Sequence, residues 1–185
     1  MTKISRRRAA AIALIAIGAS LAAASIAAIG AARAADPDMT AFKHPRQGFS
    51  IAYPADWRQA TFKDGPEFQA LANAGKGPEE CNVNVTPVSG ADYLDRINKD
   101  RMLNTIRYAM KDAQFTEWRR QTLARRWCVY YIVTGTTPRQ NYRQTTLGFQ
   151  VVVGSKLYTL SCSAPSARFE QGRPVFEKIL STLTF

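Results

Sequence analysis

The chain has 185 residues, of which 46% are hydrophobic, and it carries a formal net charge of +11 at pH 7. Five of the 25 basic residues lie in the first 34 positions, so the remaining 151 residues carry 20 basic and 14 acidic side chains. That length suits a single compact domain with its own core. The mild net charge of about +6, without a recognisable nucleic-acid motif, argues against a nucleic-acid-binding protein.

The first 34 residues have the three parts of a bacterial signal peptide. Lys3 and the arginines at 6–8 form a basic start, residues 9–29 are apolar, and Ala-Arg-Ala at 32–34 is a small-x-small cleavage pattern. We expect cleavage between Ala34 and Ala35 and export to the periplasm, by either the Sec or the twin-arginine route. The membrane would then be involved only during export. The alternative is an uncleaved anchor, because about 20 apolar residues can span a bilayer.

The next segment is polar and contains two prolines, so residues 35–47 are predicted to be a leader that precedes a single domain at 48–185. The only histidine, His44, lies in this leader and is expected to be solvated. Strand patterns then begin with alternating Phe49, Ile51 and Tyr53, which should fill one face of a sheet. Further strand patterns follow at residues 58–62, 67–73 and 81–88.

A helix is predicted over residues 91–112, which contain no Gly or Pro. Ser89 and Asp92 have the spacing of a capping box at its start. Five apolar side chains recur on one face at helical spacing and should be core: Met102, Leu103, Ile106, Ala109 and Met110.

The second half predicts four strands and a closing helix. The strands lie at residues 115–123, 125–135, 143–154 and 156–164, and the helix at 167–185, with Gly172 and Pro174 expected to break or kink its start. The strand at 125–135 is apolar on both faces, which indicates a central strand covered on both sides. The order predicts an α+β fold: a central antiparallel sheet of about six to eight strands, a helix after the fourth strand, and a C-terminal helix packed on the sheet.

The three cysteines, Cys81, Cys128 and Cys162, predict one disulfide in an oxidising compartment. Cys128 lies inside a continuous strand and is expected to be a buried free thiol. Cys81 and Cys162 lie at strand ends, which can approach closely enough to be linked. The alternative is three unpaired structural thiols.

No catalytic, metal or cofactor-binding residue is assigned. The chain lacks the spacings of zinc ligands and the glycine-rich loops that bind phosphate or dinucleotides. One surface is a candidate for binding a carboxylate, a phosphate or an acidic partner, because arginine beside aromatic rings suits such groups. This arginine hairpin comprises Trp118, Arg119, Arg120, Arg125 and Arg126. The alternative is that its arginines only solvate a turn while the tryptophans enter the core.

Two motifs resemble those of PsbP-like domains, a fold that includes DcrB-type periplasmic proteins. Residues 53–57 match Tyr-Pro-x-x-Trp, and residues 157–165 match Leu-Tyr-x-Leu-x-x-Ser-Ala-Pro before a closing helix. The resemblance covers Gln47 to Phe185 and implies an antiparallel sheet with helices on its faces, no enzyme activity and no cofactor. It also implies a role in binding proteins or stabilising assemblies. We therefore expect an envelope-protein partner, with an anionic small molecule or lipid as the alternative ligand.

Overall fold

The computed structural model describes residues 37–61, 63, 65–72, 79–123, 126–138 and 141–185. The expected cleavage point at Ala34 and Ala35 and the hairpin residue Arg125 lie outside these residues. Within the described part of the chain, no helix is long and apolar enough to cross a membrane.

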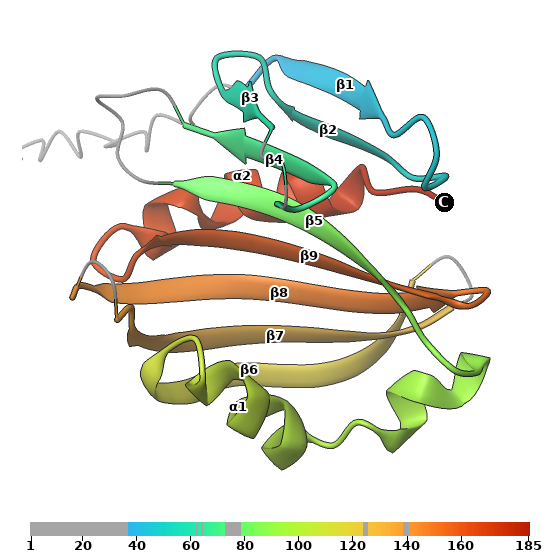
Figure 1. Cartoon of the computed structure of the whole chain (residues 1–185). Helices are drawn as coiled ribbons and strands as arrows, with labels where there is room; N and C mark the ends of the chain where they lie inside the picture. The colour runs from blue at the N-terminus through green and yellow to red at the C-terminus, as the bar shows by residue number, and fades with distance from the viewer. Residues whose placement is uncertain (1–36, 62, 64, 73–78, 124–125, 139–140) are drawn as a thin grey trace, which may run out of the picture. The chain divides into compact units, whose positions relative to one another are not determined.

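Along the chain, a group of short strands is followed by two helical segments, four long strands and a closing helix (Figure 1). In chain order the elements are β1 (Met39–Lys43), β2 (Ser50–Pro54), β3 (Arg58–Ala60), β4 (Phe68–Leu71), β5 (Glu80–Pro87), the 3₁₀ helix η1 (Ala91–Arg96), α1 (Lys99–Arg107), β6 (Lys111–Leu123), β7 (Arg126–Thr136), β8 (Arg143–Val153), β9 (Lys156–Pro165) and α2 (Phe169–Ser181).

The strands form two antiparallel sheets. Seven strands make the main sheet in the order β3-β4-β5-β9-β8-β7-β6, and β1 pairs with β2 in a separate two-stranded sheet. The joint between the two halves of the chain is the pair β5–β9, which brings the last strand beside a strand from the first half. The predicted α+β architecture with a C-terminal helix packed on the sheet is confirmed.

The main sheet separates two hydrophobic clusters, and β7 contributes to both. Cys128, Tyr130 and Ile132 face the cluster that α2 and the small sheet cover, whereas Val129 and Tyr131 face the cluster under η1 and α1. The prediction that this strand is covered on both sides is therefore confirmed, although β7 lies next to the edge of the sheet. The apolar face expected of Phe49, Ile51 and Tyr53 is also buried, in the α2 cluster.

The segment predicted as a solvated leader contains part of the fold. β1 pairs with β2 along its whole length, and Phe42 packs against the core. His44 is only 8% exposed: its Nδ1 accepts the backbone N–H groups of Arg46 and Gln47 at 3.1 and 3.0 Å, and its Nε2 lies 3.0 Å from Glu67 Oε2. The expectation of a solvated histidine is wrong because these partners come from backbone amides and from a residue distant in sequence.

The single helix predicted over residues 91–112 is also wrong. The helical segments η1 and α1 are separated by Ile97, which has extended backbone angles, and by Asn98, whose side chain accepts the Arg101 N–H at 2.8 Å as the N-cap of α1. Ser89 does not cap the first segment, since the N-cap position is Gly90 and no side chain bonds there. The N-cap at Asn98 thus starts a new helix and divides the segment that was predicted as one helix.

The predicted break at the start of the C-terminal helix does not occur. α2 begins at Phe169 and continues through both Gly172 and Pro174. A Cβ at position 172 would lie 3.3 Å from Cζ of Phe176, so the glycine leaves room for this buried ring. Packing of the helix against the sheet therefore outweighs the low helix propensity of the two residues.

The predicted disulfide is confirmed. Cys81 and Cys162 are directly opposite each other in the β5–β9 register and form a disulfide with a Cα–Cα distance of 4.0 Å. Cys128 is buried and outside any disulfide, as predicted, with its Sγ 3.1 Å from the carbonyl oxygen of Gln121. The covalent link therefore lies at the same pair of strands that joins the two halves of the sheet.

Reduction of the disulfide should lower the free energy of unfolding by about 2–5 kcal/mol, because it releases a loop closed across 81 residues. Urea unfolding with and without a reductant measures the difference, and mass spectrometry of the oxidised protein identifies the linked pair. Cys128→Ala serves as the control and should keep the same reductant-dependent difference. A linked peptide that contains Cys128 would contradict the assignment.

Candidate functional site

The arginine hairpin does not form one continuous surface. Successive side chains of a strand point to opposite faces, so Arg119 and Arg120 of β6 diverge. The Arg119 guanidinium lies 3.9 Å from the centroid of the Tyr130 ring and 3.4 Å from Glu117 Oε2. Glu117 Oε1 also forms an ion pair with Arg173 Nη2 of α2 at 2.8 Å. Arg119 therefore belongs to a network of charged side chains that connects β6 to α2.

Arg120 lies on the opposite face and holds the end of η1. Its Nη2 donates to the carbonyl oxygens of Leu94 at 3.0 Å and of Ile97 at 2.6 Å, and Nη1 lies 3.9 Å from Asp95 Oδ1. The guanidinium is 5.9 Å from the centroid of the Trp118 ring. The structure therefore brings Trp118 and Arg120 together and gives Arg120 a positioning role for η1.

The remaining described part of the hairpin is exposed. Arg126 is exposed at the start of β7, and the neighbouring Trp127 is 65% exposed, so the alternative in which both tryptophans enter the core does not hold for Trp127. Trp118 is partly buried in the cluster under η1 and α1. Among the described residues of the hairpin, Trp127 beside Arg126 is therefore the exposed aromatic side chain next to an arginine.

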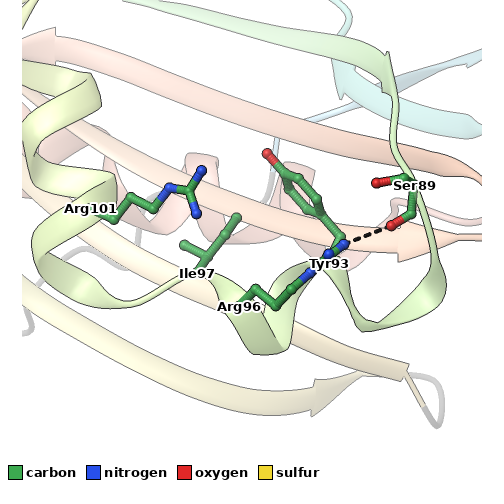
Figure 2. A pocket seen from close by; sticks show the side chains of 5 residues that line it. All are labelled: Ser89, Tyr93, Arg96, Ile97 and Arg101. Carbon is green, nitrogen blue, oxygen red and sulfur yellow. Dashed lines mark hydrogen bonds between the residues drawn. The ribbon is translucent and has the colours of Figure 1, made fainter.

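A second arginine pair lines a cleft between η1 and α1 that the sequence did not reveal. The cleft has a volume of about 210 Å³ (Figure 2). Arg101 extends from the first turn of α1 past Ile97, while Arg96 lies at the end of η1 and donates to the Ser89 carbonyl at 2.7 Å. We call this the arginine cleft; its lining residues are Ser89, Tyr93, Arg96, Ile97 and Arg101.

The helix break explains why this pair was missed. In one continuous helix, residues five apart differ by about 140° in direction, so Arg96 and Arg101 would point to different sides. The extended Ile97 and the Asn98 cap turn the chain between them and place both side chains around one cleft. Asparagine is a preferred N-cap residue, so Asn98 is the local sequence signal that could have indicated the break.

The arginine cleft continues into a smaller recess of about 100 Å³ against β8 and β9. Met102 and Leu157, both buried, make the recess partly apolar. Gln150 also lines it, and its Oε1 is buried without a hydrogen-bond partner in the described structure. We call this the inner recess; it shares Tyr93, Ile97 and Arg101 with the arginine cleft and adds Met102, Thr105, Gln150 and Leu157.

The chemistry of the cleft favours binding of an anion. Two exposed guanidinium groups supply fixed positive charge, which favours a carboxylate or a phosphate, although Arg96 already donates to the Ser89 carbonyl. The described lining residues include no carboxylate, histidine or thiol. Across the described residues, no group of three or more His, Cys, Asp or Glu side chains could hold a metal ion.

Replacing Arg120 with methionine should loosen η1, because methionine keeps an apolar stem but donates no hydrogen bond to the carbonyl oxygens. We expect a loss of about 1–3 kcal/mol in the free energy of unfolding and faster amide hydrogen exchange in residues 93–98. Exchange in α2 should change little, and Arg119→Met is the matched control that leaves residues 93–98 protected. Unchanged exchange in Arg120→Met would contradict the positioning role.

Two solved structures have folds similar to that of this chain. Cyanobacterial PsbP (CyanoP) from Synechocystis is 13% identical, with a TM-score of 0.65 and coverage of 82% of this chain and 95% of its own. LpqN, described as involved in cell envelope biogenesis of Mycobacterium tuberculosis, is 14% identical, with a TM-score of 0.55 and coverage of 80% and 90%. A search of curated proteins found no significant match. The PsbP family model matches residues 37–185, and the chain therefore belongs to the PsbP family.

Proposed function

We propose that this protein is an exported, non-enzymatic PsbP-family domain that binds another envelope protein, with the arginine cleft receiving an acidic side chain of that partner. The observation that carries the proposal is that Arg96 and Arg101 line the same cleft, which adjoins a partly apolar recess (Figure 2). Arginine in such a setting binds carboxylates through paired hydrogen bonds.

A binding role, and not catalysis, is supported by the family, whose members are generally non-catalytic. The cleft would recognise charge and shape, since its described lining offers donors and apolar atoms but no acid–base pair.

Export to the periplasm is supported by two independent features. The signal-peptide pattern of residues 1–34 predicts an exported chain. The disulfide between Cys81 and Cys162 suits an oxidising compartment. The solved relative LpqN is described as acting in cell envelope biogenesis, which is the setting proposed here.

The size of the cleft favours a partner's side chain over a separate ligand. Pockets for small molecules usually have volumes of about 300–1,000 Å³ and enclose most of the ligand. The arginine cleft, at about 210 Å³, falls below this range and is open at an exposed rim formed by Ser89, Arg96 and Arg101. A single aspartate or glutamate side chain fits these dimensions.

A second candidate is an anionic small molecule or lipid, and one observation favours it. The inner recess adds about 100 Å³ of partly apolar space, and the unpartnered Gln150 Oε1 there would gain from a ligand that donates a hydrogen bond. An amphiphile could place its anionic group between the arginines and its less polar part in the recess.

The exposed tip of the arginine hairpin is the alternative surface for a protein partner. Arg126 and Trp127 are exposed there, and Arg119 lies on the same hairpin. The hairpin and the arginine cleft are separate groups of side chains, so charge reversal can test them one at a time.

Crosslinking in the native periplasm tests the proposal. A photo-crosslinking residue at Ser89, at the rim of the cleft, should yield a discrete adduct with an envelope protein. The double variant Arg96→Glu/Arg101→Glu should lose most of this adduct, because reversed charges repel a carboxylate.

Two matched double variants serve as comparisons. Arg58→Glu/Lys63→Glu changes exposed charges near the opposite edge of the sheet and should leave the adduct intact. Loss of the adduct only in Arg119→Glu/Arg126→Glu would assign the partner to the hairpin instead. A missing adduct together with a cleft-dependent thermal shift on addition of a fatty acid or inorganic phosphate would favour the second candidate.

A further inference from the structure

A third hollow lies on the same side of the sheet, beyond the C-terminal end of α1. η1 and α1 cover the strands β6 to β8 on this side (Figure 1). Between α1 and strands β5, β9 and β8 the structure leaves a groove with a volume of about 300 Å³. We call it the polar groove, after six of its polar lining side chains, which lie on β5, β8 and β9: Glu80, Asn82, Gln144, Thr146, Ser161 and Ser163.

The strand register arranges this floor in rows. Glu80, Ser163 and Thr146 are successive cross-strand neighbours on β5, β9 and β8, and their side chains share one face. The next row begins with Asn82 and Ser161. The polar side chains are therefore spaced by neighbouring strands, about 5 Å apart.

Gly148 and Tyr131 complete the second row. A Cβ at position 148 would lie 2.0 Å from the Tyr131 Cζ, so the ring of Tyr131 lies across the bare backbone of β8. Its hydroxyl thereby reaches Ser161 on β9, two strands away. Burial raises the pKa of Tyr131 to about 12, so the hydroxyl stays protonated and adds another neutral polar group to the floor.

The hydrogen bonds within the floor leave capacity for a ligand. Thr146 and Ser163 share one hydrogen bond of 2.8 Å, and the Gln144 side chain donates to Thr146 Oγ1 at 3.3 Å. A hydroxyl can donate once and accept twice, and Asn82, whose Oδ1 accepts from Asn84, keeps its own amide N–H groups for other partners. The floor can therefore both donate to and accept from a bound molecule.

The charge of the lining restricts that molecule. Glu80 is the only charged residue in the described lining, and its Oε2 already accepts from Gln69 at 3.0 Å. No described lining residue is a lysine or arginine, so an anion would meet a carboxylate without a compensating cation. One wall is apolar: Ile106 in the last turn of α1 forms it together with Ala109 and Met110, which follow the helix.

We propose that the polar groove binds a short, uncharged carbohydrate. A sugar ring carries several hydroxyl groups, which act as donors and acceptors like those of the floor, and apolar C–H faces, which suit the α1 wall. The volume is at the lower end of the usual range for ligand pockets. This ligand differs from the anion assigned to the arginine cleft, so the two sites stand independently.

A peptide segment is a poorer match for the groove. Peptides that bind sheets commonly add a strand to an open edge. The strands β9 and β8 are paired on both sides, and β5 is paired with β4 and β9 over Glu80–Val83, the part that lines the groove, so the backbone groups there are already used in the sheet. Only side chains remain to bind a ligand at this floor, and they offer the hydroxyl and amide groups that a sugar can use.

Titration of the ¹⁵N-labelled domain with maltotriose, cellotriose and N,N′-diacetylchitobiose, followed by NMR, tests the proposal. At least one sugar should cause saturable shifts confined to amides around the polar groove, with a Kd of about 1 mM or lower. Asn82→Ala should weaken that binding about fivefold to tenfold, because the sugar loses one or two hydrogen bonds. Asn104→Ala, on the exposed surface of α1, is the matched control and should bind as wild type.

Other results would separate sugar binding at the polar groove from binding at the arginine cleft. Arg96→Glu/Arg101→Glu should retain sugar binding, which keeps a failure of the proposed function distinct from a failure of this site. Absence of saturable shifts with all three sugars up to about 10 mM, well above a weak millimolar Kd, would overturn the proposal. Shifts of the groove amides by a neutral alanine–glycine peptide but by none of the sugars would also overturn it. Thermal unfolding of each variant establishes that it is folded.

Discussion

The pairing of β5 with β9 is the constraint on which the rest of the fold depends. It joins the strands of the first half of the chain to the meander of the second half, and Cys81–Cys162 links the two strands covalently within that register. Because side chains alternate along a strand, this register also assigns every residue of β5 to one face. The disulfide therefore lies on the α2 side, while Glu80 and Asn82 line the polar groove on the other.

The two faces of the main sheet consequently differ in how completely other elements cover them. The α2 side is closed by a large apolar cluster to which β2 and α2 both contribute. The α1 side is only half covered, since η1 and α1 lie over one end of the strand order. Hollows form at the limits of this partial cover: the arginine cleft between the two helical segments and the polar groove beyond α1.

Much of the architecture was predictable because apolar periodicity and strand-end position are local signals. They correctly indicated the α+β order, the doubly covered strand predicted at 125–135 and observed as β7, and the pairing of Cys81 with Cys162. The errors at His44 and β1 arose because stabilising partners lie outside residues 35–47, whereas the error over residues 91–112 arose from the local N-cap Asn98. His44 lies 3.0 Å from Glu67, and β1 is stabilised by pairing with β2. Neither partner can be recognised from the polar segment alone.

The sequence by itself determined the family motifs, the basic and apolar N-terminal pattern, and the alternation that builds the sheet, since these depend on neighbouring residues. Only the tertiary structure decided which polar side chains meet. Arg119 and Arg120 are adjacent in sequence yet serve opposite faces of β6. Arg96 and Arg101 line one cleft because the chain turns at Ile97, and Asn82 lines the same groove as Thr146 through strand pairing. The candidate binding surfaces arise from strand register and from the helix break, which bring together residues that no local spacing relates.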